Sequence, residues 1–197
     1  MRVKNDETAA GVSTPWYAVY TRHQHEKTVA HGLAGKEFEI FLPLYLAARR
    51  WNDRIARISL PLFPGYVFLR GDLERRLDIL TTPGVHSLVS SGGQPASIAD
   101  TEVEAVRRAV EARLPVEPCA FLNCGDRVRV TSGPLADLEG IVVRKKNSCR
   151  LVLSVELLEK SIAVEVDGSA LERILVQPDR MRNGWKQPGF RIVPASA

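Results

Sequence analysis

The residues best suited to chemistry in this sequence belong to a basic hairpin, "RRWNDRIARI", in which arginines surround a tryptophan. Arginine suits phosphate contact and an exposed aromatic ring suits base stacking, and proteins hold single-stranded nucleic acid through these two contacts. A charged hairpin that is merely solvated fits the same pattern, and the charges alone do not separate the two interpretations. The candidate nucleic-acid-binding residues are Arg49, Arg50, Trp51 and Arg54 in the hairpin, with Arg75 and Arg76 on a later helix.

A second set of candidates consists of aromatic side chains on one face of two expected strands. Side chains alternate along a strand, so Tyr66 and Phe68 share a face opposite to Val67 and Leu69. By the same alternation, Tyr20 lies on the opposite face of its strand from Val19. If the aliphatic set packs under helices, the rings are exposed, and contiguous exposed aromatics mark a partner surface. The alternative is that the strand parity is reversed, or that the linker or the second domain covers the rings.

Residue types that serve catalysis occur without the spacing that catalysis needs. His25 and His31 lie on or beside one amphipathic helix but are not one turn apart. The sequence has no Gly-rich phosphate loop, nucleophile elbow or paired-carboxylate motif. The odd number of cysteines, without a paired spacing, favours free thiols in a reducing compartment. We therefore expect a protein that is not an enzyme and that has no metal or other cofactor; the three cysteines are Cys119, Cys124 and Cys149.

The positive charge of this 197-residue chain is concentrated near its end. The formal net charge is +4, and residues 178–197 carry four basic and one acidic side chain, whereas residues 122–177 carry eight of each. This modest excess supports weak, salt-sensitive contact with a polyanion and not tight sequence-specific binding. No run reaches the length of a membrane span and the start lacks a signal-peptide core, so we expect a cytoplasmic protein without a membrane partner.

Elements in the first half of the chain follow the order strand, helix, strands, helix, strand, helix. This order predicts a split βαβ arrangement in an α+β domain, with helices covering one face of a mainly antiparallel sheet. The first helix is expected to bury Val29 and Leu33. The third helix, within "IADTEVEAVRRAVEARL", shows capping-box spacing between Thr101 and Glu104.

The second half of the chain reads as strands after a short connection. Residues 115–122 contain two prolines and no periodicity, which is typical of an interdomain linker. Five short strands with glycine turns at Gly133 and Gly140 then predict a small closed or nearly closed barrel. The expected strands are 127–131, 141–145, 151–157, 162–166 and 171–175.

Several of these stretches together resemble a known family. "WYAVYTRHQHEKTVAHGL", "FLPL", "LPLFPGYVFL" and "GVHSLV" resemble the amino-terminal NGN domain of NusG-type transcription elongation factors, and "GDRVRVTSGPLADLEGIV" is similar to their KOW motif. The resemblance implies a ferredoxin-like NGN domain followed by a five-stranded SH3-like KOW barrel. The implied boundaries are a flexible amino terminus at 1–14, the NGN domain at 15–114, the linker at 115–122, the KOW domain at 123–177 and a basic tail at 178–197.

The resemblance also implies partners for these residues. The NGN domain would bind the clamp helices of the largest RNA polymerase subunits and enhance processivity, and the basic hairpin and second helix would lie near upstream or non-template DNA. The family places the polymerase contact on the aromatic face, so the implied polymerase-binding residues are Tyr20, Tyr66, Phe68, Leu88 and Val89. The KOW barrel would recruit a further partner, for which the candidate residues are Leu157, Leu158 and Lys160.

One loop departs from the pattern of housekeeping members. Where those members carry an aromatic residue followed by Gly and Arg, and meet a ribosomal protein or the termination factor Rho, this chain has Leu158 and Glu159. The departure weighs against both partners and is more similar to specialised antitermination paralogues of the UpxY or RfaH kind. The alternative function is an RRM-like RNA-binding module that acts independently of polymerase, since such domains share this strand order and stack bases on sheet aromatics.

Overall fold

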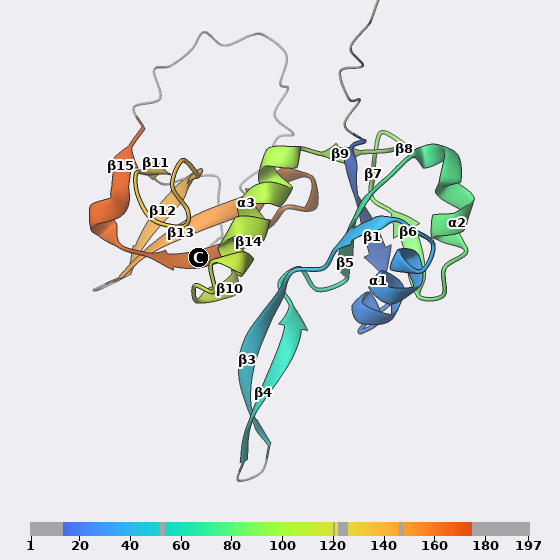
Figure 1. Cartoon of the computed structure of the whole chain (residues 1–197), viewed down its shortest axis with the longest axis horizontal. Coiled ribbons are helices and arrows are strands. Elements are labelled where there is room, and N and C mark those ends of the chain that lie inside the picture. Colours follow the sequence, from blue (N-terminus) through green and yellow to red (C-terminus); the bar gives the residue numbers. More distant parts are fainter. Residues whose placement is uncertain (1–13, 52–53, 120, 122–125, 146–147, 175–197) are drawn as a thin grey trace, which may run out of the picture.

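The computed structural model describes residues 14–51, 54–119, 121, 126–145 and 148–174. Within these residues the chain has a mixed α/β fold with two larger antiparallel sheets, which confirms the expected class (Figure 1). The tail at 178–197 lies outside the described residues.

The first sheet has the strand order β2-β5-β1-β6, with β9 paired to the start of β1. Strand β5 is antiparallel to both β1 and β2, so it lies between two strands that run in the same direction and are joined by helix α1. The sheet strands are β1 (Trp16–Thr21), β2 (Glu39–Phe41), β5 (Tyr66–Arg70), β6 (Val85–Leu88) and β9 (Ser97–Ile98).

Two helices cover one face of this sheet. Val29 and Leu33 of α1 are fully buried, as the helical spacing predicted, and pack with Val19, Val67 and other aliphatic side chains of the sheet. The second helical segment leaves Leu77 75% exposed. The elements are α1 (Glu26–Ala34), the 3₁₀-helix η1 (Leu73–Arg75) and α2 (Arg76–Leu80).

A long two-stranded hairpin projects away from both sheets (Figure 1). It consists of β3 (Leu44–Trp51) and β4 (Arg54–Pro61), which pair antiparallel from end to end. A much smaller hairpin, β7 (Ser90–Ser91) with β8 (Gln94–Pro95), follows the first sheet.

Helix α3 (Asp100–Glu111) lies between the two sheets (Figure 1). Val103 and Val106 of this helix are buried. The expected capping box is wrong, because Ala99 occupies the N-cap position and the helix has no side-chain cap. Thr101 therefore lies inside the first turn, where its hydroxyl is not placed to cap the helix.

The second sheet has six strands in the order β10-β14-β13-β12-β11-β15 rather than the five expected. Its first strand, β10, falls within residues predicted to be a linker. Pro118 argued against a strand there, but β10 pairs only with β14, and an edge strand tolerates the missing N–H of proline. The strands are β10 (Val116–Cys119), β11 (Asp126–Val130), β12 (Glu139–Lys145), β13 (Ser148–Val155), β14 (Lys160–Val166) and β15 (Leu171–Arg173), with 3₁₀-helices η2 (Glu156–Leu158) and η3 (Gly168–Ala170).

One hydrophobic cluster joins the two halves of the molecule. It contains Trp16 and Phe68 of the first sheet, Val106 of α3, and Leu135 and Leu158 of the second half. Apolar side chains that are buried together lose their contact with water, so this cluster holds the second sheet against α3.

Candidate interaction surface

Three aromatic rings meet at one edge of the first sheet and form what we call the aromatic edge: Tyr20, Tyr66 and His86. The ring centroids of Tyr20 and Tyr66 are 5.4 Å apart, and those of Tyr20 and His86 are 5.2 Å apart. Tyr20 is 42% exposed, which confirms the expected exposure of this ring. Burial and the nearby Tyr20 raise the pKa of Tyr66, so its hydroxyl stays protonated near neutral pH and can donate a hydrogen bond.

A fixed turn positions Tyr20 and Tyr66. Gly65 adopts φ of +85°, and a Cβ there would lie 3.3 Å from the Tyr20 ring. The Gly65 N–H donates to the buried carboxylate of Glu26 at 2.8 Å, and the Gly65 carbonyl accepts from the Thr21 N–H at 2.8 Å. Glycine is favoured because the turn needs a positive φ and a Cβ would be in tight contact with the Tyr20 ring. The two rings are therefore held in place by the backbone of their neighbours.

Phe68 does not form part of the exposed surface. The predicted parity is right, because Phe68 lies opposite to the aliphatic face packed under α1, but the ring is only 1% exposed. Phe41 stacks on it at 5.9 Å, and Phe63 contacts it edge-on at 5.4 Å. The expectation that Phe68 is exposed is therefore wrong, because residues next to the hairpin cover it.

Leu88 is the last residue of β6, and Val89 directly follows it. Leu88 is 5% exposed and packs with the helix-covered face, whereas Val89 is partly buried against the cluster that contains Phe68. Neither forms an open surface. The exposed ring of the predicted set is therefore Tyr20, whereas Tyr66 is partly buried against the same cluster as Val89. His86 is the one ring of the aromatic edge that the sequence pattern did not single out.

The candidate nucleic-acid-binding residues of the hairpin lie at its far end. Backbone pairing places Arg49 opposite Ala56 and Trp51 opposite Arg54. The side chains of the four hairpin candidates lie outside the described residues, so their prediction stays untested. Leu46, nearer the sheet, is 71% exposed.

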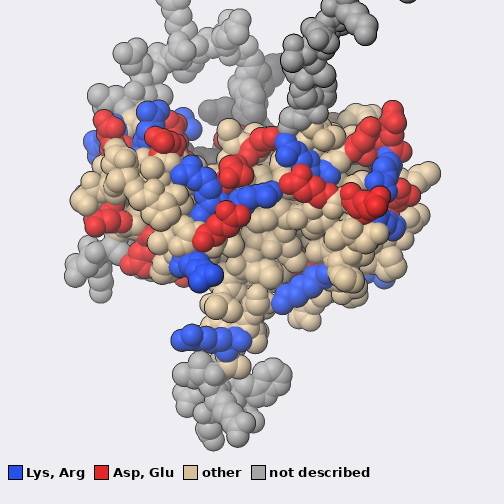
Figure 2. Space-filling view, in the orientation of Figure 1, with Lys and Arg blue, Asp and Glu red and all other residues tan. Residues whose placement is uncertain are grey.

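Figure 2 shows acidic and basic side chains interspersed over this side of the molecule, without a large field of one sign.

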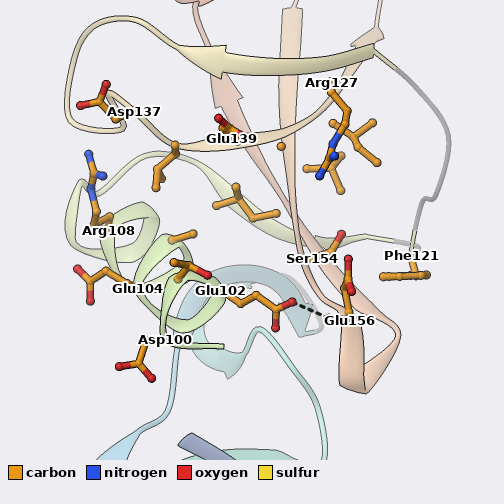
Figure 3. A pocket seen from close by; sticks show the side chains of 17 residues that line it. Asp100, Glu102, Glu104, Arg108, Phe121, Arg127, Asp137, Glu139, Ser154 and Glu156 are labelled. Carbon is orange, nitrogen blue, oxygen red and sulfur yellow. Dashed lines mark hydrogen bonds between the residues drawn. The ribbon is translucent and has the colours of Figure 1, made fainter. Parts of the chain in front are cut away.

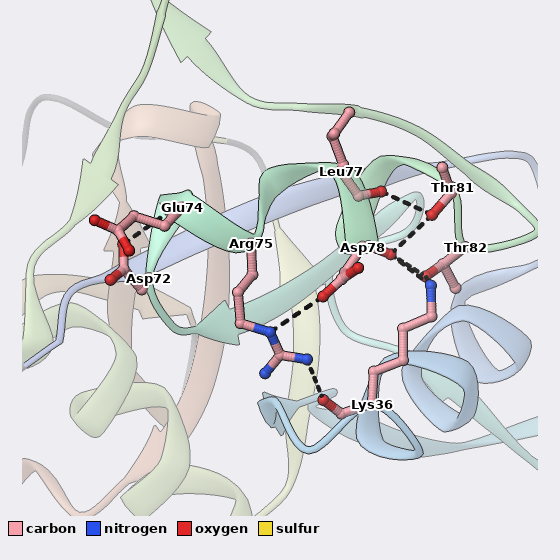
Figure 4. A network of polar contacts seen from close by, with 8 residues as sticks. All are labelled: Lys36, Asp72, Glu74, Arg75, Leu77, Asp78, Thr81 and Thr82. Carbon is pink, nitrogen blue, oxygen red and sulfur yellow. Dashed lines mark hydrogen bonds and ion pairs between the residues drawn. The ribbon is translucent and has the colours of Figure 1, made fainter.

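Arg75 is engaged within the fold rather than held free. Its guanidinium donates to the Asp78 carboxylate at 3.1 Å and to the carbonyl of Lys36 at 2.9 Å (Figure 4). The guanidinium carbon also lies 4.3 Å from the ring centroid of Phe38. Lys36 in turn donates to the hydroxyl of Thr82 at 2.8 Å. These contacts tie α2 to the end of α1. Arg76, in contrast, is exposed.

The candidate partner-binding residues of the second half lie in and after η2. Leu158 is 7% exposed and belongs to the cluster that joins the two halves, and Leu157 packs against that cluster. Lys160 is exposed. The loop expected to meet a partner thus has its leucines directed into the protein in this arrangement.

A contact between α3 and the second half was missed by sequence reasoning. Arg108 donates to the backbone carbonyls of Ala136 at 2.7 Å and Pro134 at 3.0 Å, and Leu135 between them is 2% exposed. At the start of α3, the Glu102 carboxylate accepts from the Glu156 N–H at 3.5 Å. The one sequence feature that could have indicated this contact is Leu135, an apolar residue within a glycine-containing turn.

The part of the chain that the structure describes contains no cluster of three or more residues that could hold a metal ion. Its two described cysteines, Cys119 and Cys149, are unpaired, and Cys124 lies outside the described residues. None of the described helices is both long and apolar enough to span a membrane.

Comparisons with known proteins find similar proteins over most of this chain. Residues 14–107 match the NusG family model, described as transcription termination factor nusG. The chain is 28% identical over 173 residues to the transcription termination/antitermination protein NusG of Pseudomonas aeruginosa, covering 81% of this chain and 98% of that protein. It is 29% identical over 180 residues to the protein of the same name from Thermus thermophilus, covering 80% and 97%. A solved structure titled "Domain interaction in Thermotoga maritima NusG" is similar with a TM-score of 0.51 and 25% identity, covering 82% of this chain and 98% of that one.

Proposed function

We propose that this chain is a non-enzymatic member of the NusG family of transcription termination and antitermination proteins, to which it is similar over most of its length, and that it binds RNA polymerase and supports elongation. In this proposal the first half is an NGN domain of ferredoxin-like type, and the second sheet is an SH3-like KOW barrel. The family match at residues 14–107 supports the first assignment, and the relatives that align over most of the chain, together with the six-stranded antiparallel sheet, support the second. The comparisons give no support to the alternative of an RNA-binding module independent of polymerase.

The observation that carries the proposal is the aromatic edge. Tyrosine supplies a large, rigid contact area with a polar tip, and it is enriched among the residues that dominate binding energy at interfaces. The ring centroids of Tyr20 and Tyr66 are 5.4 Å apart, and the turn at Gly65 holds both rings in place. Little conformational entropy is therefore lost when a partner packs on them. A helical surface on the polymerase clamp is a partner of the right kind for such a ridge.

We assign the direct contact to the two tyrosines and a supporting role to Phe68. Since Phe41 and Phe63 cover its ring, Phe68 fixes the strand that carries Tyr66. Leu88 supports β6 from the helix-covered face, and Val89 packs against the cluster on the opposite face.

The remaining assignments follow from position. The far end of the hairpin, with Arg49, Arg50, Trp51 and Arg54, extends from the body and would reach upstream or non-template DNA, with Arg76 as a further contact. Arg75 would have to leave its contacts with Asp78 and Lys36 to take part. The residues Leu157, Leu158 and Lys160 would recruit a second partner after the second sheet separates from α3. Such a factor acts in the cytoplasm, where the polymerase is.

Binding of the full chain to core RNA polymerase tests the proposal. The double variant Tyr20→Ala/Tyr66→Ala is expected to bind at least about tenfold more weakly than the unmodified chain, which corresponds to about 1.4 kcal/mol. Equilibrium titration with a fluorescently labelled chain measures this loss.

The matched control is Leu77→Ala. Leu77 is 75% exposed, so the substitution also removes an exposed apolar side chain, but from α2 rather than the aromatic edge. The control is expected to bind as tightly as the unmodified chain. Equal binding by the double variant and the unmodified chain would reject the aromatic edge as the contact.

A further inference from the structure

A cleft of about 1020 Å³ lies beside the contact between α3 and the second sheet and is lined by both (Figure 3). Its apolar surface comes from α3, from the second sheet and from the ring of Phe121 after β10. The side chains that provide it are Ala105, Phe121, Leu138, Ile141, Val152 and Leu153. A groove with this lining gains free energy when an apolar side chain fills it.

Carboxylates surround this apolar surface. Three of them, Glu102, Asp137 and Glu156, form no ion pair within the described part of the chain. Glu102 and Glu156 face the same end of the cleft, and burial together with the charge of Glu156 raises the pKa of Glu102 (Figure 3). The groove therefore fits an occupant that is both apolar and cationic.

The end of this chain has that composition. Residues 178–197 contain four basic side chains and one acidic side chain, and aromatic residues lie between the basic ones. The sequence "RMRNGWKQPGFR" places Trp185 and Phe190 among Arg180, Arg182, Lys186 and Arg191.

The described chain also ends beside the cleft. The N–H of Ile174, the last described residue, donates to the carbonyl of Arg127 at 2.9 Å, and Arg127 lines the cleft (Figure 3). Trp185 follows eleven residues later, and a chain of that length reaches up to about 36 Å when extended. Tethering gives the segment an effective concentration of the order of millimolar at the cleft, so even a weak contact is occupied.

We propose that residues 178–197 of this chain dock in the cleft between α3 and the second sheet, with their aromatic side chains on its apolar surface and their basic side chains against Glu102, Asp137 and Glu156. The docked segment reinforces the contact between the two halves of the protein. The inference concerns the chain alone and does not depend on a polymerase contact.

Fluorine NMR of the full chain labelled with 5-fluorotryptophan tests this inference. The chain has three tryptophans, and Trp185→Phe assigns the signal of Trp185. In the unmodified chain this signal is expected to differ from that of a free peptide of residues 178–197. It is expected to move to the peptide position in a tail variant in which Arg180, Arg182, Lys186 and Arg191 are all replaced by Gln.

A charge-matched pair of variants locates the contact. Glu102→Gln/Asp137→Asn/Glu156→Gln is expected to move the Trp185 signal to the peptide position as well. The control Glu37→Gln/Glu74→Gln/Glu111→Gln removes the same charge from exposed positions outside the cleft and is expected to leave the signal in place. Trp16 is 3% exposed in the core, so its unchanged signal shows that each variant is folded.

Three results would overturn the inference. The first is a Trp185 signal in the unmodified chain that coincides with that of the free peptide. The second is an equal shift in the cleft variant and its control. The third is a Trp185 signal that has the same position in the cleft variant as in the unmodified chain but shifts when single-stranded DNA is added. The segment would then be a nucleic-acid-binding arm. If the cleft variant alters Trp16, the tail variant decides the question, because its substitutions all lie outside the described fold.

Discussion

The guanidinium of Arg108 donates a 2.7 Å hydrogen bond to the backbone carbonyl of Ala136, and this bond crosses from α3 to the turn between β11 and β12. A second bond, to the carbonyl of Pro134, fixes the same turn on both sides of the buried Leu135. Hydrogen bonds from a charged donor contribute more to stability than neutral ones, so Arg108 stabilises the contact between the two halves.

Replacing Arg108 is expected to loosen the turn it holds. Arg108→Ala should reduce the free energy of local opening of residues 131–138 by about 1–2 kcal/mol, because two charge-assisted hydrogen bonds at a partly exposed site are lost. Hydrogen exchange in this segment should become about five- to thirty-fold faster, as read by mass spectrometry. Arg76→Ala removes an exposed arginine elsewhere and should leave the segment unchanged; equal exchange in both variants would contradict the role of Arg108.

Glu102 is expected to make stability depend on pH. Burial and the charge of Glu156 raise its pKa above the ordinary value of 4.5, so the folded chain binds this proton more tightly than the unfolded chain. The resulting stabilisation is fully present below the ordinary pKa and is lost as the pH rises through the raised one. Urea unfolding of Glu102→Gln between acidic and neutral pH should therefore show a smaller fall in stability than the unmodified chain.

The control for that titration is Glu111→Gln, which removes a carboxylate from the last turn of the same helix without contacting Glu156. A pH dependence in Glu102→Gln as steep as in the unmodified chain would show that Glu102 is not the responsible group.

Gly140 is expected to tolerate no side chain. A Cβ at this position would lie 2.6 Å from the carbonyl oxygen of Val152 and 2.9 Å from Cδ1 of Leu151, so two paired strands would have to separate. Gly140→Ala should lower the free energy of unfolding by about 1–3 kcal/mol, measured by urea denaturation.

The comparison for Gly140 is Gly35→Ala at the end of α1. Gly35 has φ of −64°, and a Cβ there would make only ordinary contacts at 3.6 Å. This substitution is expected to be neutral or to stabilise by up to about 1 kcal/mol. Equal losses in the two variants would mean that the close approach at Gly140 does not limit stability.

Local patterns in the sequence predicted those features that depend on local geometry. The spacing of Val29 and Leu33 located the buried face of α1, and strand alternation put Tyr66 and Phe68 on one face. Both follow from the repeat of a single helix or strand. Gly140, in contrast, was expected in a turn between strands, but it lies within β12 opposite Val128, where the lack of a side chain permits the close approach of β13.

Features that depend on distant segments were not predictable in this way. Phe68 is buried because Phe41 and Phe63 fold over it, and strand alternation says nothing about residues beyond the strand. Likewise, β10 exists because β14 offers it a partner, with Pro118 opposite Ile162. The contact between Arg108 and the turn at Ala136 joins residues 28 positions apart in the chain.

The most direct test of the account is a site-specific photo-crosslink from the aromatic edge to core RNA polymerase. A photoreactive phenylalanine analogue at Tyr20, which is 42% exposed, is expected to crosslink to the largest polymerase subunits, whereas the same group at Leu77 is not. Crosslinking from position 77 with none from position 20 would contradict the assignment of the polymerase contact to the aromatic edge.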